Sequence, residues 1–122
     1  DIIPVLTVLA AVSEGTTKII NAGRLRIKEC DRLAAMTSEL NKMGAAITEE
    51  AEGLTISGKP EGLQGGVEVD AWNDHRIAMS LAIAAQSCAE PITLTGAGSV
   101  SKSYPDFWED YKSVGGKIEV LA

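Results

Sequence analysis

An internal repeat constrains the fold of this chain more than any other feature of its sequence. When the first half is laid on the second, matching residues lie 71 to 75 positions apart, as in the pairs Asp1 with Asp74 and Lys28 with Lys102. Each copy, about residues 1–58 and 67–122, predicts an apolar helix headed by an acid, a strand, an Ala-Gly loop ending at a lysine, a second helix, and a strand after a glycine. Such a repeat indicates one supersecondary unit that stacks on its copies to bury a shared core.

Hydrophobic patterning predicts how the helices of these units pack. Ile3–Ser13 and Ile77–Cys88 are apolar almost all round, which is typical of helices buried on every side. Asp31–Met43 is amphipathic instead, and Gly44 follows it in the position that commonly ends a helix. The core stripe of this helix consists of Leu33, Met36, Leu40 and Met43.

Short β-branched segments bounded by turn residues predict the strands. They are Thr17–Asn21, Ala45–Glu49, Leu54–Ser57, Val67–Asp70, Ile92–Thr95 and Lys117–Leu121. Glu50–Gly53 is expected to turn a hairpin and residues 58–66 to form a loop. Because Leu54–Ser57 alternates while two of the predicted helices are apolar on almost every side, we expect an α/β fold turned inside out, with helices in the centre and sheets facing solvent. Two units can hardly enclose two such helices, so a further unit is expected.

Composition excludes several classes of function. The 122 residues amount to one domain at most, and a net charge of −6 argues against a general nucleic-acid or membrane-surface binder. Cys30 and Cys88 lack metal-ligand spacing, so we expect reduced thiols in a cytoplasmic protein, without a metal site or a disulfide. The apolar stretches are too short to cross a bilayer. Since the chain opens on Asp1 and not on Met, we expect a piece of a longer protein.

Basic residues gather between the first predicted strand and the amphipathic helix. Arg24, Arg26, Lys28 and Arg32 are four of the eleven Lys and Arg residues. We expect the first three to alternate along an extended stretch, and Glu29, Asp31 and Arg32 to lie in the first turn of the helix, where free backbone N–H groups attract anions. A charge run alone is more often a solvated face. The recurrence of Lys28 as Lys102 favours an anion-binding site.

Four motifs, in order along the whole chain, carry a resemblance to a known family. They are Asp1–Pro4, Lys28–Leu33, Asn73–Met79 and Lys102–Phe107. Together they are similar to motifs of the 5-enolpyruvylshikimate-3-phosphate synthase family, also called 3-phosphoshikimate 1-carboxyvinyltransferases. The resemblance implies the C-terminal portion of an enzyme with two domains of repeated βαβαββ units and an active site in the cleft between them. It also implies an enzyme without a cofactor, the target of glyphosate.

The resemblance further implies roles for individual residues. Asp1 would contact shikimate 3-phosphate and accept a proton, and Lys28 would contact the same substrate. Glu29 would serve proton transfer at the enolpyruvyl methylene. The cations that would hold phosphoenolpyruvate by its carboxylate and phosphate are Arg32, Arg76 and Lys102. The missing N-terminal portion would complete the site.

The chemistry of enolpyruvyl transfer explains why carboxylates and guanidinium groups would be needed. Alternative functions also stay open. Two proton transfers suit two carboxylates, and guanidinium groups suit a small trianion. A UDP-N-acetylglucosamine enolpyruvyl transferase is the alternative within the fold, and a non-catalytic anion-binding module is the alternative outside it. His75 is interpreted as structural and Asp74 as a helix-start residue.

Overall fold

The computed structural model describes residues 2–119, and of Lys102 only the backbone. Its elements follow one another along the chain as helices, short strands and 3-10 turns. They are α1 (Ile3–Ala11), β1 (Thr16–Ile19), η1 (Gly23–Ile27), α2 (Arg32–Lys42), β2 (Ala46–Glu50), β3 (Gly53–Ser57), β4 (Leu63–Gly65), β5 (Glu68–Asp70), α3 (His75–Ala85), β6 (Cys88–Glu90), β7 (Thr93–Thr95), η2 (Ala97–Lys102) and α4 (Phe107–Ser113).

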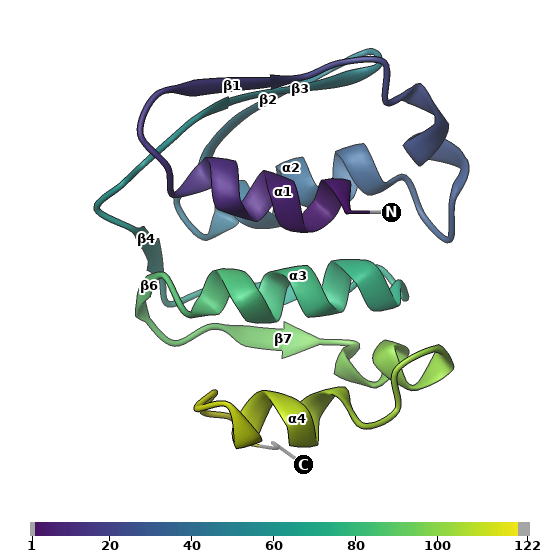
Figure 1. Cartoon of the computed structure of the whole chain (residues 1–122), viewed down its shortest axis with the longest axis vertical. Coiled ribbons are helices and arrows are strands. Elements are labelled where there is room, and N and C mark those ends of the chain that lie inside the picture. The colour runs from purple at the N-terminus through teal and green to yellow at the C-terminus, as the bar shows by residue number, and fades with distance from the viewer. Residues whose placement is uncertain (1, 120–122) are drawn as a thin grey trace.

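The helices α1, α2 and α3 form the middle layer and pack on one another (Figure 1). On one side they are covered by an antiparallel sheet of order β1-β3-β2. On the other side lie β7, which pairs in parallel with β5, and then α4. The mixed α/β fold with central helices and outer sheets is therefore confirmed.

The sheet over α1 and α2 has one buried face and one solvent-exposed face. Leu54 and Ile56 of β3 are buried against the helices, whereas most residues of β1 and β2 are exposed. Ile47 is the buried residue of β2, and Asn41 at the end of α2 hydrogen-bonds both its N–H and its C=O at 2.9 Å. Alternation along the strands therefore sets the register of the sheet against the helix layer.

Helix α2 has the core stripe and the end predicted for it. Leu33, Met36, Leu40 and Met43 are at most 1% exposed. Gly44 follows with a φ of 108°, a left-handed conformation that residues with a Cβ rarely adopt. The helix begins one residue later than predicted because Asp31 is its N-cap, accepting a hydrogen bond from the Ala34 N–H.

Helix α1 differs from the prediction of burial on every side. Leu6 is 42% exposed and Leu9 is 61% exposed, and Ile2 just before the helix is 66% exposed. Thr7, Val8 and Ala11 face the core. The sequence pattern indicated apolar residues on all sides of α1, but within the described residues only one side of the helix has protein packed against it.

Several boundaries also differ from the predictions. The loop predicted for residues 58–66 contains β4, which pairs in parallel with β6. The helix predicted to end at Cys88 ends at Ala85, and Cys88 opens β6. Residues 117–119 form no strand, and 120–121 lie outside the described residues. Short strands are easily missed, because their pairing partners are distant in sequence.

The order of elements is similar in the two proposed repeats. The first repeat contains, in order, α1, β1, η1 and α2. The second contains α3, β6, β7, η2 and α4. The division into copies at 1–58 and 67–122 stays a prediction. Over the described residues, none of the helices is long and apolar enough to span a membrane.

Candidate functional site

The starts of α2 and α3 lie side by side and bring together segments that are far apart in sequence. Arg32, the first residue of α2, forms an ion pair with Asp74, the N-cap of α3. Glu29 precedes α2, and His75 is the first residue of α3. The candidate site, meaning these residues together with Cys30, is therefore built where parallel helices begin.

Asp74 is the fixed centre of the site. It is fully buried, and its Oδ2 accepts from Arg32 Nε at 2.8 Å while its Oδ1 accepts from Arg32 Nη2 at 3.3 Å. Oδ1 also accepts from the backbone N–H of Arg76 at 2.9 Å, which caps α3. Burial alone would raise the pKa of Asp74, but hydrogen bonds from Arg32, from the Arg76 N–H and from Cys30 together lower it. Asp74 is therefore held as a carboxylate.

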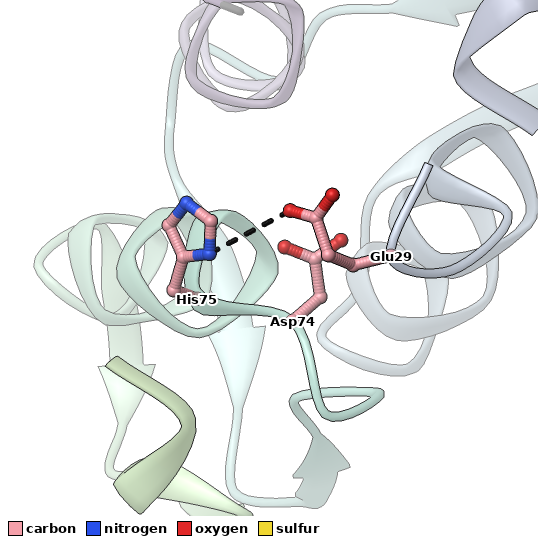
Figure 2. Close-up of side chains that lie close together, drawn as sticks. All are labelled: Glu29, Asp74 and His75. Atoms are coloured by element: carbon pink, nitrogen blue, oxygen red, sulfur yellow. Dashed lines mark ion pairs between the residues drawn. The ribbon is translucent and has the colours of Figure 1, made fainter. Parts of the chain in front are cut away.

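Glu29 contacts Arg32 from the solvent side. Its Oε2 accepts from Arg32 Nη2 at 2.6 Å, and its side chain is 46% exposed, whereas that of Arg32 is 3% exposed. His75 Nδ1 lies 3.7 Å from the same oxygen. Figure 2 shows the imidazole and the Glu29 carboxylate facing each other, with Asp74 beside them. A guanidinium, a half-exposed carboxylate and an imidazole can together bind an anion and move a proton.

Glu29, Asp74 and His75 also have the spacing of a metal cluster. Their ligand atoms lie within 4.8 Å of one another. However, the carboxylates of both acids already accept hydrogen bonds from Arg32. A metal ion there would be repelled by the guanidinium and would have to compete with it, so this donor set does not suit a metal.

Cys30 belongs to the packing of the site and not to its reactive groups. Its Sγ donates to Asp74 Oδ2 at 3.3 Å. Burial, followed by the hydrogen bond to Asp74, raises the pKa of the thiol to about 12. Since the thiolate is the nucleophile of cysteine chemistry, this residue is unreactive at neutral pH.

The loop before α3 is held in a strained conformation. Trp72 and Asn73 have φ values of 56° and 52°, which residues with a Cβ rarely adopt. Glu39 of α2, buried at 1% exposure, accepts from Trp72 Nε1 at 3.0 Å and from the Asp70 N–H at 2.8 Å. These bonds fix the loop that presents Asp74 to Arg32.

The basic segment before α2 differs from its prediction. Residues 23–27 form the 3-10 helix η1 and not an extended stretch, and Glu29 lies outside α2. Arg26 turns to the β2–β3 hairpin, where it pairs with Glu49 at 2.6 Å, and it also pairs with Asp31, the N-cap of α2, at 2.8 Å. It is therefore a structural clamp. Lys28, the residue after η1, is exposed, as is Arg24.

The other predicted site residues lie outside the contact between Glu29 and Arg32. Arg76 is the second residue of α3, half-buried, and Lys102 is the last residue of η2. Asp1 lies outside the described residues. The structure thus joins Glu29 and Arg32 directly. The sequence did not indicate that Asp74 and His75 take part in this contact, although Asp74 occupies the position in the second repeat that Asp1 occupies in the first.

Comparison with known proteins supplies the family. The sequence model of the family described as EPSP synthase (3-phosphoshikimate 1-carboxyvinyltransferase) matches residues 1–111 of the chain. The chain belongs to the EPSP synthase family. The 3-phosphoshikimate 1-carboxyvinyltransferase of Clostridium novyi (strain NT) is 61% identical over 119 residues, which are 98% of this chain and 27% of that protein. That of Clostridium beijerinckii is 65% identical over 119 residues, again 98% of this chain and 27% of that protein.

Solved structures agree with the assignment to the EPSP synthase family. EPSP synthase from Acinetobacter baumannii superposes with a TM-score of 0.92 at 37% identity, over 98% of this chain and 28% of that chain. The enolpyruvyl transferase NikO from Streptomyces tendae superposes with a TM-score of 0.70 at 26% identity, over 95% of this chain and 25% of that chain. This chain therefore spans about a quarter of the length of the relatives it matches.

Proposed function

We propose that this chain is part of an enzyme that transfers the enolpyruvyl group of phosphoenolpyruvate to the 5-hydroxyl of shikimate 3-phosphate and releases phosphate. Membership of the EPSP synthase family supports the reaction. The contact between Arg32 and Glu29, at 2.6 Å, carries the proposal structurally. It joins a cation suited to an anionic substrate with a carboxylate suited to proton transfer.

The reaction needs an acceptor for the hydroxyl proton and a donor to the methylene. We assign Asp1 to the hydroxyl of shikimate 3-phosphate, with Lys28 holding that substrate, and Glu29 to the methylene. The hydroxyl oxygen attacks the carbon that bears the phosphate while the methylene takes a proton and becomes a methyl group. The adduct then loses phosphate as the methyl group gives up a proton, which restores the carbon–carbon double bond. Holding both substrates in place is worth up to about 7–11 kcal/mol. The proposal requires no metal or cofactor.

Arg32, Arg76 and Lys102 are assigned to phosphoenolpyruvate. A guanidinium can hold carboxylate or phosphate oxygens by paired hydrogen bonds, and a lysine adds a point charge. Arg32 and Arg76 lie in the first turns of neighbouring helices and both donate to Asp74, Arg32 through its side chain and Arg76 through its backbone N–H, which supports a common ligand. The remainder of the longer protein is the proposed partner and would supply the opposite wall of the site. A cytoplasmic location is proposed because neither cysteine forms a disulfide.

Phosphate release by the longer enzyme tests the proposal. With phosphoenolpyruvate and shikimate 3-phosphate, the wild type should turn over, and Glu29→Gln should lower the turnover number by about 10²–10⁴-fold. Glu14→Gln, which changes an exposed glutamate between α1 and β1, is the control for the lost charge. Turnover with UDP-N-acetylglucosamine in place of shikimate 3-phosphate would favour the alternative transferase. Binding of phosphoenolpyruvate without turnover on either acceptor would favour the anion-binding module.

A further inference from the structure

Arg32, the proposed cation for phosphoenolpyruvate, is already neutralised in the structure. Its side chain is 3% exposed and contacts Asp74 through Nε and Nη2 and Glu29 through Nη2. The guanidinium and these carboxylates sum to a charge of −1. An anion that approaches Arg32 therefore meets a carboxylate that already occupies the guanidinium.

The carboxylates on Arg32 differ in how firmly they are held. Asp74 is fully buried, caps α3 and also accepts from Cys30. Moving Asp74 away from Arg32 would leave an unpaired charge buried in the protein, which is costly. Glu29 is 46% exposed and lies in a bend outside any helix or strand. Its carboxylate contacts Arg32 and, at 3.7 Å, His75. Glu29 is therefore the partner that an incoming anion can replace.

We propose that Glu29 is an internal stand-in for the anionic substrate. In the free protein its carboxylate occupies Arg32, and the carboxylate or phosphate of phosphoenolpyruvate displaces it, while Asp74 continues to hold the guanidinium in place. The inference rests on the proposed function, which supplies the ligand. Displacement releases the Glu29 side chain at the moment when the ligand arrives, so the proton-transfer group becomes available only in the occupied site.

This exchange, in which phosphoenolpyruvate displaces Glu29 from Arg32, predicts that one substitution has opposite effects on the binding of phosphoenolpyruvate and on turnover. Glu29→Gln removes the competing charge but keeps the shape of the side chain. Since an ion pair with a half-exposed partner contributes about 0.2–1 kcal/mol, phosphoenolpyruvate should bind about 1.4- to fivefold more tightly to the variant in the absence of the second substrate. Turnover should fall, because the proton-transfer group is lost. A residue that only supported the fold would weaken both.

The β2–β3 hairpin offers a matched control. Glu49 pairs with Arg26 at 2.6 Å and is 36% exposed, so Glu49→Gln removes the same charge from a similar Glu–Arg pair outside the site. The dissociation constant of phosphoenolpyruvate should be measured by ³¹P NMR titration of the longer enzyme for the wild type, Glu29→Gln and Glu49→Gln. We expect tighter binding by Glu29→Gln alone.

The outcomes separate this inference from the proposed function. If the wild type turns over but Glu29→Gln binds phosphoenolpyruvate more weakly, Glu29 is a direct ligand of the substrate and the exchange is wrong. Equal shifts in Glu29→Gln and Glu49→Gln would show a general charge effect and would also overturn it. A wild type that neither binds phosphoenolpyruvate nor turns over would overturn the proposed function, and the exchange with it.

Discussion

Asp74 holds the guanidinium of Arg32 by accepting hydrogen bonds from Nε at 2.8 Å and from Nη2 at 3.3 Å, although the two residues are 42 positions apart in sequence. The pair connects the first residue of α2 to the cap of α3. A single buried carboxylate thus fixes the angle of a proposed substrate-binding cation and the start of the neighbouring helix. Several measurable consequences depend on this arrangement.

Asp74→Asn should destabilise the longer protein strongly. Removing one partner of a buried ion pair typically costs about 3–5 kcal/mol in the free energy of unfolding. The measurement is chemical denaturation. Asp31→Asn is the matched control, because Asp31 caps α2 and pairs with Arg26 but is 33% exposed. It should cost about 1 kcal/mol or less. Equal losses in the two variants would contradict the importance of burial.

Stability should fall in acid because of Glu39 and Asp74. For both residues burial favours a raised pKa, but hydrogen bonds outweigh it, so the folded-state pKa of each carboxyl lies below its ordinary value. A carboxyl with a depressed pKa stabilises the fold above its unfolded-state pKa, and this stability is lost as the pH falls through its folded-state pKa.

The acid limb of the stability curve can be measured by urea unfolding between pH 3 and 7. Glu39→Gln and Asp74→Asn should each lower stability at pH 7 and flatten the loss in acid. Glu61→Gln, at an exposed position, controls for net charge. Curves that run parallel to the wild type in all variants would show that these carboxyls do not control the acid limb.

Arg32→Lys and Arg76→Lys should weaken the binding of phosphoenolpyruvate selectively. Lysine keeps the charge but loses the fork of N–H donors that suits carboxylate and phosphate. Calorimetric titration should show reduced affinity for phosphoenolpyruvate and little change for shikimate 3-phosphate. Arg26→Lys is the control, because it removes the same fork from a guanidinium that pairs with Glu49 in the β2–β3 hairpin. A similar loss for both ligands would mean that the arginines support the fold instead.

The 122-residue chain produced alone should show no transferase activity. It spans about a quarter of the length of its relatives, and the exposed apolar side of α1 includes Leu6 and Leu9. Such a surface should associate with itself or with the rest of the longer protein. Mixing the chain with the separately produced remainder should restore some phosphate release.

Analytical ultracentrifugation and a phosphate-release assay test this prediction together. Leu6→Glu with Leu9→Glu should reduce both association and recovery of activity, since these changes charge the apolar side of α1. Ile20→Glu, an exposed apolar residue after β1, is the control. Clear turnover by the purified chain alone would show that the site is not shared with another part of the protein.

Local patterns in the sequence were sufficient for the helices, the main sheet and the family. The apolar stripe of α2 and the glycine at its end are read from neighbouring residues, and β2 and β3 lie beside each other in a hairpin. The ordered motifs identified the family without a structure. Short strands were less predictable, because β4 and its partner β6 are separated in sequence by β5 and α3.

The site depended on contacts that no local pattern encodes. The sequence indicated Arg32 and Glu29, but it did not indicate that Asp74 would hold Arg32, because hydrogen bonds between residues 42 positions apart depend on how α2 packs on α3. Nor did it show that Arg26 would turn to the hairpin. The sequence by itself determined which residue types stand at the starts of the helices. Only the tertiary structure decided which charges pair, because pairing follows from distance and burial in space.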